Sequence, residues 1–444
     1  MNPMTGIPSP SDGSATPRVE VDDSGRARVL WLQTDDVRVG VVPALGGRVL
    51  SLVTRAGEHL FRNRELLDDA VHPTREIAEI QKASNGALGS WLNWGGDKTW
   101  PAPQGWFRPD EWPGPPDAVL DGGPYIASWN VDDRGASVEM RSPHDPRTGL
   151  SIRRRVEVTR GKSGYRLTST FTNTSDRDVR WAIWQVVQLP GARRVAVEAT
   201  EVGLGVWIST GQDPEVPVEH LIAGTGHLKV DHGCAEVVWV PPQDVVGKVG
   251  FPTASGWLAH ANDGRLTALR FVPEPGATYP DRGSRVEVWM EHPLSKPLPE
   301  LGGLRPRNRV VECEVLGPLQ TMSPGSSTQL ATDVLGCSGE GPVHDVQPGA
   351  CLLEPLIAVS DRLRLNVTGR LGAFSTGPVT IELLDPSQAI LRAIPFGQAS
   401  AGTSFELGLA VDAPDATTSV VVHFGGSVVA SAQVNPQSEW RGRA

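Results

Sequence analysis

Apolar and polar positions alternate in short runs along most of this chain, which is the pattern of half-buried β-strands. The first two runs are V-L-W-L-Q-T at residues 29–34 and V-R-V-G-V-V-P at residues 37–43. Later runs of the same kind cover residues 150–160, 165–174, 179–190, 285–292 and 309–316. Helical spacing is rare, and only residues 75–82 predict a helix. The pattern therefore predicts an all-β protein built from many antiparallel strands.

The composition of the strands changes near residue 340, which indicates a second domain. Thirteen of the 14 tryptophans precede this point, and only Trp440 follows it. Residues 338–350 are rich in Gly and Pro, as linkers are, and regular turns follow them. We predict a disordered tail at residues 1–17, a large antiparallel supersandwich at residues 18–337, a linker at residues 338–350 and a small immunoglobulin-like β-sandwich at residues 351–436.

Charge and cysteine content exclude several classes of partner. The net charge of −10 and the lack of a long basic run argue against a nucleic-acid partner. No stretch has the composition of a signal peptide or of a membrane span, so we expect no membrane partner. The four cysteines lie far apart without C-x-x-C spacing, at positions 234, 313, 337 and 351. This spacing favours reduced thiols and a cytoplasmic location.

The densest cluster of aromatic residues is W-L-N-W-G-G-D-K-T-W-P-A-P-Q at residues 91–104. It has neither helical nor strand periodicity, so it predicts an ordered loop. Flat indole faces beside polar groups suit a ligand with C–H faces and hydroxyls, and a sugar is such a ligand. The alternative is that the tryptophans only close one end of a β-fold. In the same segment Asp97 and Lys98 form either an ion pair or a clamp for the substrate.

Two strands each carry a pair of glutamates on one face. Glu287 and Glu291 share a face with Trp289, and Glu312 and Glu314 share a face of another strand. Two acids on one face repel each other unless the face is solvated, paired or catalytic. A carboxylate in a cleft can act as a general base, and a second group must then supply a proton.

The sequence supports no cofactor and no metal. It has no G-x-S-x-G, G-x-G-x-x-G or P-loop motif, which argues against nucleophile-elbow, dinucleotide and NTPase chemistry. His220, His227 and His232 lie near Asp231 and Cys234, but their spacing matches no compact zinc pattern.

Two segments and the tryptophan loop together resemble galactose mutarotase (aldose 1-epimerase)-like proteins. V-P-A-L-G-G-R-V-L-S-L at residues 42–52 resembles their opening strand, turn and strand. V-V-E-C-E-V-L-G-P-L-Q-T-M-S-P-G-S-S at residues 310–327 resembles their closing segment. The loop N-W-G-G-D-K-T-W-P-A-P-Q is similar to one uncharacterised branch of that superfamily. The resemblance covers about residues 20–335 and implies a supersandwich that binds sugar on its concave face.

The resemblance also implies roles for single residues. In the family, a glutamate on the closing strand takes the anomeric proton and a histidine protonates the ring oxygen. Glu312 matches the glutamate, and Glu314 takes the place of a polar neighbour. The histidines are absent, since Gln185 and Trp94 occupy the matching positions. A glutamine cannot act as a general acid, so we expect little mutarotation of free glucose or galactose.

These observations predict a protein that binds a sugar or sugar-like substrate and acts on it by acid–base chemistry. The predicted catalytic residues are Glu312, Lys98 and Asp97, and the predicted binding residues are Trp94, Trp100, Asn93, Arg48, Gln185, Glu291 and Glu314. An isomerase or epimerase is the first choice. The alternatives are a glycoside lyase or hydrolase on the same scaffold and a carbohydrate-binding protein without catalysis.

Overall fold

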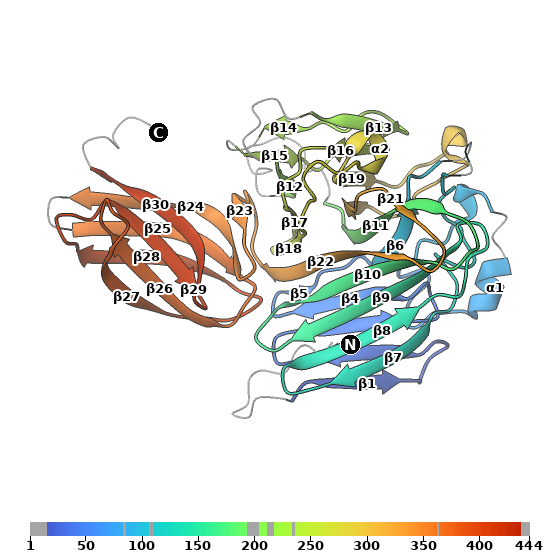
Figure 1. Ribbon diagram of the computed structural model, residues 1–444, viewed down its shortest axis with the longest axis horizontal. Helices are drawn as coiled ribbons and strands as arrows, with labels where there is room; N and C mark the ends of the chain where they lie inside the picture. The colour runs from blue at the N-terminus through green and yellow to red at the C-terminus, as the bar shows by residue number, and fades with distance from the viewer. Residues whose placement is uncertain are drawn as a thin grey trace.

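The computed structural model describes residues 16–82, 86–105, 108, 110–192, 204–210, 217–232, 236–361 and 364–436. Nearly all of these residues are in strands or in the turns between them, arranged as three sheets (Figure 1). The predicted all-β class with large antiparallel sheets is confirmed. The predicted helix is also present, as α1 at Ile77–Lys82. Most of the predicted tail, residues 1–15, lies outside the described residues.

The first sheet has twelve strands, of which ten follow one path from edge to edge. Along that path they are β1 Arg18–Asp22, β2 Val29–Gln33, β3 Arg38–Val42, β4 Arg48–Thr54, β6 Asp97–Ala102, β11 Val179–Pro190, β20 Val310–Leu316, β19 Val286–Glu291, β16 Gly247–Phe251 and β13 Glu219–Ala223. The short strands β5 Gly57–Glu58 and β21 Gln320–Met322 pair with β4 and β11. Four strands far apart in the sequence, β4, β6, β11 and β20, are therefore neighbours at its centre.

The second sheet has ten strands and packs against the first. In order they are β14 Asp231–His232, β15 Val237–Val240, β12 Gly205–Ser209, β17 Trp257–Asn262, β18 Arg265–Arg270, β22 Ser327–Ser338, β10 Gly164–Asn173, β9 Leu150–Thr159, β8 Gly135–Arg141 and β7 Ile126–Val131. Apolar residues of both sheets form one continuous core, to which β11 contributes Ile183 and Val187 and β10 contributes Leu167 and Phe171. This arrangement buries one face of the first sheet against the second.

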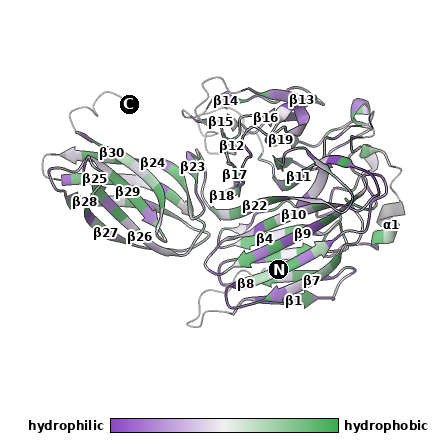
Figure 2. Cartoon of the chain, in the orientation of Figure 1, coloured by the Kyte–Doolittle hydropathy of each residue, from purple (hydrophilic) through white to green (hydrophobic). Residues whose placement is uncertain are grey.

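The third sheet lies beyond β22 and has its own core (Figure 1). Its strands are β23 Asp345–Val346, β24 Ala350–Asp361, β25 Arg364–Ala373, β26 Gly377–Leu384, β27 Ile390–Ala399, β28 Ser404–Asp412, β29 Ser419–Phe424 and β30 Ser427–Pro436. Hydrophilic and hydrophobic bands alternate along them in Figure 2, because successive side chains point to opposite faces. A third apolar cluster joins this sheet to the second sheet and includes Trp207, Cys337, Cys351 and Phe374.

The tryptophan segment differs from its prediction as one ordered loop. Residues 91–96 are irregular, but Asp97–Ala102 forms β6, a strand inside the first sheet. All six of its residues are buried, because both faces of a central strand are covered, and no polar–apolar alternation marks it. β4 pairs with β6 only at Asp97. Pro101 pairs with Ile183 of β11, but on the β4 side it lies beyond the pairing, where a residue without an N–H is tolerated.

Candidate functional site

One face of the first sheet, the face turned away from the second sheet, gathers charged and aromatic side chains. Cross-strand partners point to the same face, and Gln188 pairs with Glu312, Glu312 with Trp289, and Trp289 with Lys248. Lys98 joins them from β6, since it pairs with Val186, two residues from Gln188. Five strands that span residues 97–316 thus contribute to one polar patch.

A cavity with about 540 Å³ of empty volume lies over this face. Its aromatic wall consists of four tryptophans, Trp91, Trp100, Trp184 and Trp289. Lys248, Glu291, Glu312 and Gln104 provide its polar groups.

Two loop segments meet above the cavity. The first contains the short 3₁₀ helix η1 at Leu88–Ser90, and the second contains η3 at Pro299–Leu301. The amide of Gly89 donates a hydrogen bond to the carbonyl of Gly302 at 3.0 Å. Leucines from both segments line the cavity, namely Leu88, Leu301 and Leu304. The cavity therefore has an apolar rim above a charged floor.

Lys98 and Glu312 form a buried ion pair beside the cavity. The Lys98 Nζ lies 3.0 Å from the Glu312 Oε1, and the two residues are 2% and 7% exposed. The same ammonium lies 4.6 Å from the ring centre of Trp91 and 4.2 Å from that of Trp100. Cation–π contacts of this kind stabilise a desolvated cation. Among the described residues that line the cavity, Glu312 is present and Lys98 is not, so Lys98 contacts a lining carboxylate without lining the cavity itself.

A second lysine balances the remaining acids of this face. The Lys248 Nζ lies 2.8 Å from one carboxylate oxygen of Glu287 and 2.8 Å from one of Glu314. It also lies 4.1 Å from the ring centre of Trp184, whose Nε1 donates a hydrogen bond to Glu314 at 2.7 Å. Burial alone lowers the pKa of Lys248, but the two carboxylates outweigh burial and raise it. Lys248 therefore stays protonated.

The two acids that line the cavity have pKa values shifted in opposite directions. Burial raises the pKa of Glu291 to about 8, and the charge of Glu312 adds to this shift. Burial also acts to raise the pKa of Glu312, but Lys98, Lys248 and a hydrogen bond from Gln188 outweigh it and lower the pKa. At neutral pH one acid is therefore protonated and the other is ionised. Such a separation is the usual sign of an acid and a base in one site.

Asp121 fixes the orientation of the aromatic wall. Its two carboxylate oxygens accept hydrogen bonds from the Nε1 of Trp91 at 2.8 Å and the Nε1 of Trp100 at 3.1 Å. The guanidinium of Arg48 pairs with the same carboxylate. One buried carboxylate thus holds both indoles that contact the Lys98 ammonium.

The prediction that Asp97 shares the cavity with Lys98 and Glu312 is wrong. Adjacent residues in a strand point to opposite faces, so Asp97 points into the core between the sheets. There it is 0% exposed and accepts hydrogen bonds from Arg154 at 2.6 Å, Tyr165 at 2.7 Å and Gln185 at 2.9 Å. Gln185 is therefore a core residue as well, and neither side chain reaches a ligand in the cavity.

Three further predicted binding residues lie outside the cavity. Trp94 is buried in a separate apolar cluster beside β2 and β4. The side chain of Asn93 accepts a hydrogen bond from the Gly95 amide and so stabilises the turn. Arg48 is fully buried and binds Asp121, which makes it a support for the tryptophans. Glu314, also predicted, adjoins the cavity through Trp184 and Lys248.

The other three predicted residues, Glu312, Glu291 and Trp100, line the cavity. Sequence reasoning missed Lys248, Trp184 and Asp121. Trp184 lies two residues from Val186 and four from Gln188, so the period of the strand would have placed it on this face. Lys248 is a lone charge in an apolar strand, G-K-V-G-F, which is a weak signal. No feature of the sequence indicates the partners of Asp121.

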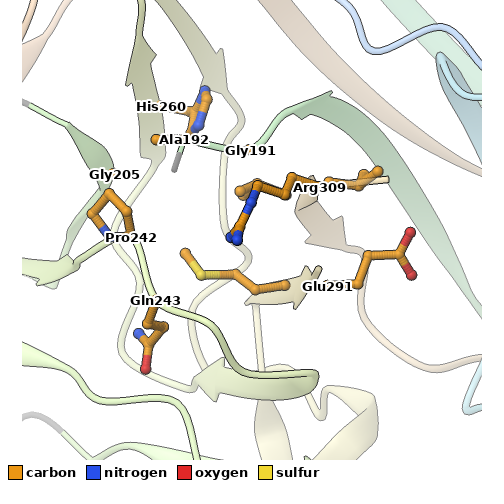
Figure 3. Close-up of a pocket in the computed structure, with 11 residues that line it drawn as sticks. Gly191, Ala192, Gly205, Pro242, Gln243, His260, Glu291 and Arg309 are labelled. Carbon is orange, nitrogen blue, oxygen red and sulfur yellow. The ribbon is translucent and has the colours of Figure 1, made fainter. Parts of the chain in front are cut away.

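A smaller cavity, with about 310 Å³ of empty volume, adjoins the end of β19 (Figure 3). Its lining residues include His260, Gln243, Arg309 and the backbone at Gly191. Glu291 borders both cavities, and in Figure 3 its carboxylate points away from His260 and Arg309. Its acidic group therefore belongs to the tryptophan-lined cavity.

The sequence predicted that the histidines from His220 to His232 do not form a zinc site. The rings of His220 and His227 have centres 4.7 Å apart. Cys234 and the side chain of His232 lie outside the described residues. In the part of the chain that the structure describes, no helix is long and apolar enough to cross a membrane.

Together these features define an all-β protein with an aromatic, acid-containing cavity on one face of a large antiparallel sheet. The chain belongs to the family described as a domain of unknown function (DUF4380), whose model matches residues 27–334. The match includes every residue of the cavity and ends before the third sheet. No curated protein matches the chain.

Solved structures of low sequence identity are similar to the chain. A TPR-domain containing protein from Parabacteroides distasonis is 14% identical over 72% of this chain, with a TM-score of 0.48, and the chain spans about half of that protein, 49%. A galactose mutarotase-like protein from Lactobacillus casei is 11% identical over 69% of this chain and 99% of its own, with a TM-score of 0.43. A galactose mutarotase-like protein from Clostridium acetobutylicum is 8% identical over 73% and 99%, also with a TM-score of 0.43.

Proposed function

We propose that this protein binds a sugar or sugar-like molecule in the tryptophan-lined cavity and converts it by acid–base chemistry. The observation that carries the proposal is that two acids line one cavity, and the shifts support it, since the pKa of Glu291 is raised to about 8 and that of Glu312 is lowered. Two carboxyl groups in different protonation states can donate and accept a proton in the same reaction.

The walls of the cavity support a carbohydrate ligand. Four indoles form the wall. Trp91 is the most exposed of them, and a flat apolar indole face suits the C–H face of a pyranose ring. Gln104, Glu291 and Glu312 offer hydrogen-bond partners for hydroxyl groups. Both nearby lysines already bind carboxylates, so the charged groups of the site are largely paired before a ligand enters.

Glu312 is the proposed base, and its position agrees with the resemblance to the closing strand of the mutarotase-like proteins. Lys98 holds the carboxylate ionised and fixes one of its oxygens, Oε1. Glu291 is the proposed acid and supplies the proton for which the sequence offers no histidine. In an isomerase or epimerase Glu312 would accept a hydroxyl proton, while Glu291 would protonate the ring oxygen and so open the ring. Protonation of a glycosidic oxygen by Glu291 would give the alternative, a glycoside hydrolase or lyase.

A second candidate is sugar binding without catalysis. It is favoured by the ion pair itself, because a carboxylate that Lys98 and Gln188 already hold is a weaker proton acceptor. Binding would then depend on the indoles and not on proton transfer.

The test combines a ligand screen with two amide variants of the full chain. Tryptophan fluorescence would be followed while neutral sugars, glycosides, phosphorylated sugars and cyclitols are added. Conversion of every binding compound would then be followed by NMR and polarimetry. We expect Glu312→Gln and Glu291→Gln to keep most of the binding and to lose roughly 10²–10⁴-fold in turnover. Glu406→Gln, at an exposed residue of the third sheet, is the matched control.

Each outcome separates the candidates. Binding without conversion in the wild type would favour the non-catalytic candidate. Unchanged turnover in both amide variants would refute the assigned roles. Failure of every compound to change the fluorescence would refute the carbohydrate ligand.

A further inference from the structure

Two of the cysteines, on strands of different sheets, meet at the joint between the second and third sheets. Cys337 is the second-last residue of β22, and Cys351 is the second residue of β24. Figure 1 shows β22 ending where β23 and β24 begin. The two Sγ atoms are 4.0 Å apart, and the residues are 0% and 1% exposed. Both are free thiols.

The backbone opposite the two sulfurs is shaped to leave room for them. Gly372 on β25 is the cross-strand partner of Cys351. A Cβ at Gly372 would lie 2.5 Å from the Cys337 sulfur and 2.7 Å from the Cys351 sulfur. Any larger residue would therefore push the sulfurs out of their place. The glycine lets both side chains occupy one small space without an intervening group.

Other contacts hold the same joint and keep the two strands in position. The Ser338 amide donates a hydrogen bond to the Gly402 carbonyl at 3.1 Å, and the Ser338 hydroxyl contacts the Ser404 hydroxyl at 3.3 Å. Trp207 and Phe374 are buried in the apolar cluster around the sulfurs. A new bond between the sulfurs would thus reinforce an existing contact, and it would bring the two sulfurs about 2 Å closer together.

We propose that Cys337 and Cys351 are a site of oxidative modification, at which an intramolecular disulfide fastens the third sheet to the second. Two thiols lose two protons and two electrons as the S–S bond forms. A two-electron oxidant, such as an azodicarboxamide, takes up both protons and both electrons and becomes the hydrazine. No other pair of described cysteines is placed for this reaction, because Cys313 lies on β20 in the core of the first sheet.

The reaction in the native protein should be slow. The contact with Cys351 and burial raise the pKa of the Cys337 thiol, and the thiolate is the reactive form. Oxidant must also reach a buried site, so opening of the joint limits the rate. A low denaturant concentration that loosens the joint should accelerate the reaction.

The experiment uses the reduced full-length chain treated with diamide, with and without a low concentration of urea. Free thiols are then blocked, and the chain is digested and mapped by mass spectrometry. We expect a linked pair of peptides that contains Cys337 and Cys351 and is lighter than the two thiol peptides by about 2 Da. Cys337→Ser and Cys351→Ser should each abolish it, and Cys313→Ser should leave it in place.

Limited proteolysis gives a second readout that does not depend on the variants. Cleavage within residues 339–349 should leave two fragments that stay together on a non-reducing gel only after oxidation. The proposal would be overturned if both cysteines were still free after oxidation and so were fully labelled by the blocking reagent. A disulfide that joins other cysteines would overturn it as well. A result of either kind leaves the proposed sugar site unaffected, since the joint lies outside that cavity.

Discussion

Replacement of Glu291 by glutamine tests the central feature of the site without knowledge of its substrate. The folded chain raises the pKa of Glu291 from its ordinary value of 4.5 to about 8. Between these pH values the folded chain therefore holds a proton that the unfolded chain has lost. By linkage, the contribution of this group to the free energy of unfolding is complete below pH 4.5 and is lost as the pH rises toward 8.

The magnitude follows from the difference between the two pKa values. At about 1.4 kcal/mol for each pH unit between the two pKa values, a fully buried side chain would contribute about 5 kcal/mol to the free energy of unfolding. The Glu291 side chain is only half-buried, and water reduces the effect, so we expect about 2–4 kcal/mol. The amide of Glu291→Gln has no titrating proton and should lack this part of the pH dependence.

The assay is urea unfolding of the wild type and Glu291→Gln at pH 5, 6, 7 and 8. Other buried acids contribute to both curves, so only the difference between the curves is read. We expect the variant to gain stability relative to the wild type as the pH rises. Glu406→Gln, at an exposed position, should follow the wild type at every pH. Parallel curves for the wild type and Glu291→Gln would refute the assignment of Glu291 as the protonated acid.

Three other substitutions test the supports of the site and the joint. Glu312→Gln should lower the free energy of unfolding by about 3–5 kcal/mol in urea, because it leaves Lys98 buried without a counter-ion. Lys98→Met, added to Glu312→Gln, should recover most of this loss. Asp121→Asn should alter the near-ultraviolet circular dichroism of the tryptophans by freeing the Trp91 indole, and an unchanged spectrum would show that Asp121 does not orient the ring. Gly372→Ala should lower stability by about 1–3 kcal/mol through overpacking against the cysteine sulfurs, and an unchanged midpoint would contradict the tight contact.

The sequence by itself determined the fold class and much of the floor of the site. Strand periodicity placed Glu312 with Glu314, and Glu291 with Trp289, on shared faces, and the structure keeps both pairs. These relations hold within one strand, so they need only the alternation of side chains. The density of tryptophan marked residues 91–104 for the same reason, since it is a local property of the chain.

The tertiary structure decided which face of each strand lies on the side of the cavity. β6 is covered on both sides, so its sequence shows no alternation, and only the register with β11 places Lys98 in the site and Asp97 in the core. Lys248 and Asp121 reach the site from distant segments, and Cys337 meets Cys351 only because β22 and β24 converge. Such meetings depend on how strands, loops and sheets pack over long sequence distances, which local pattern does not encode.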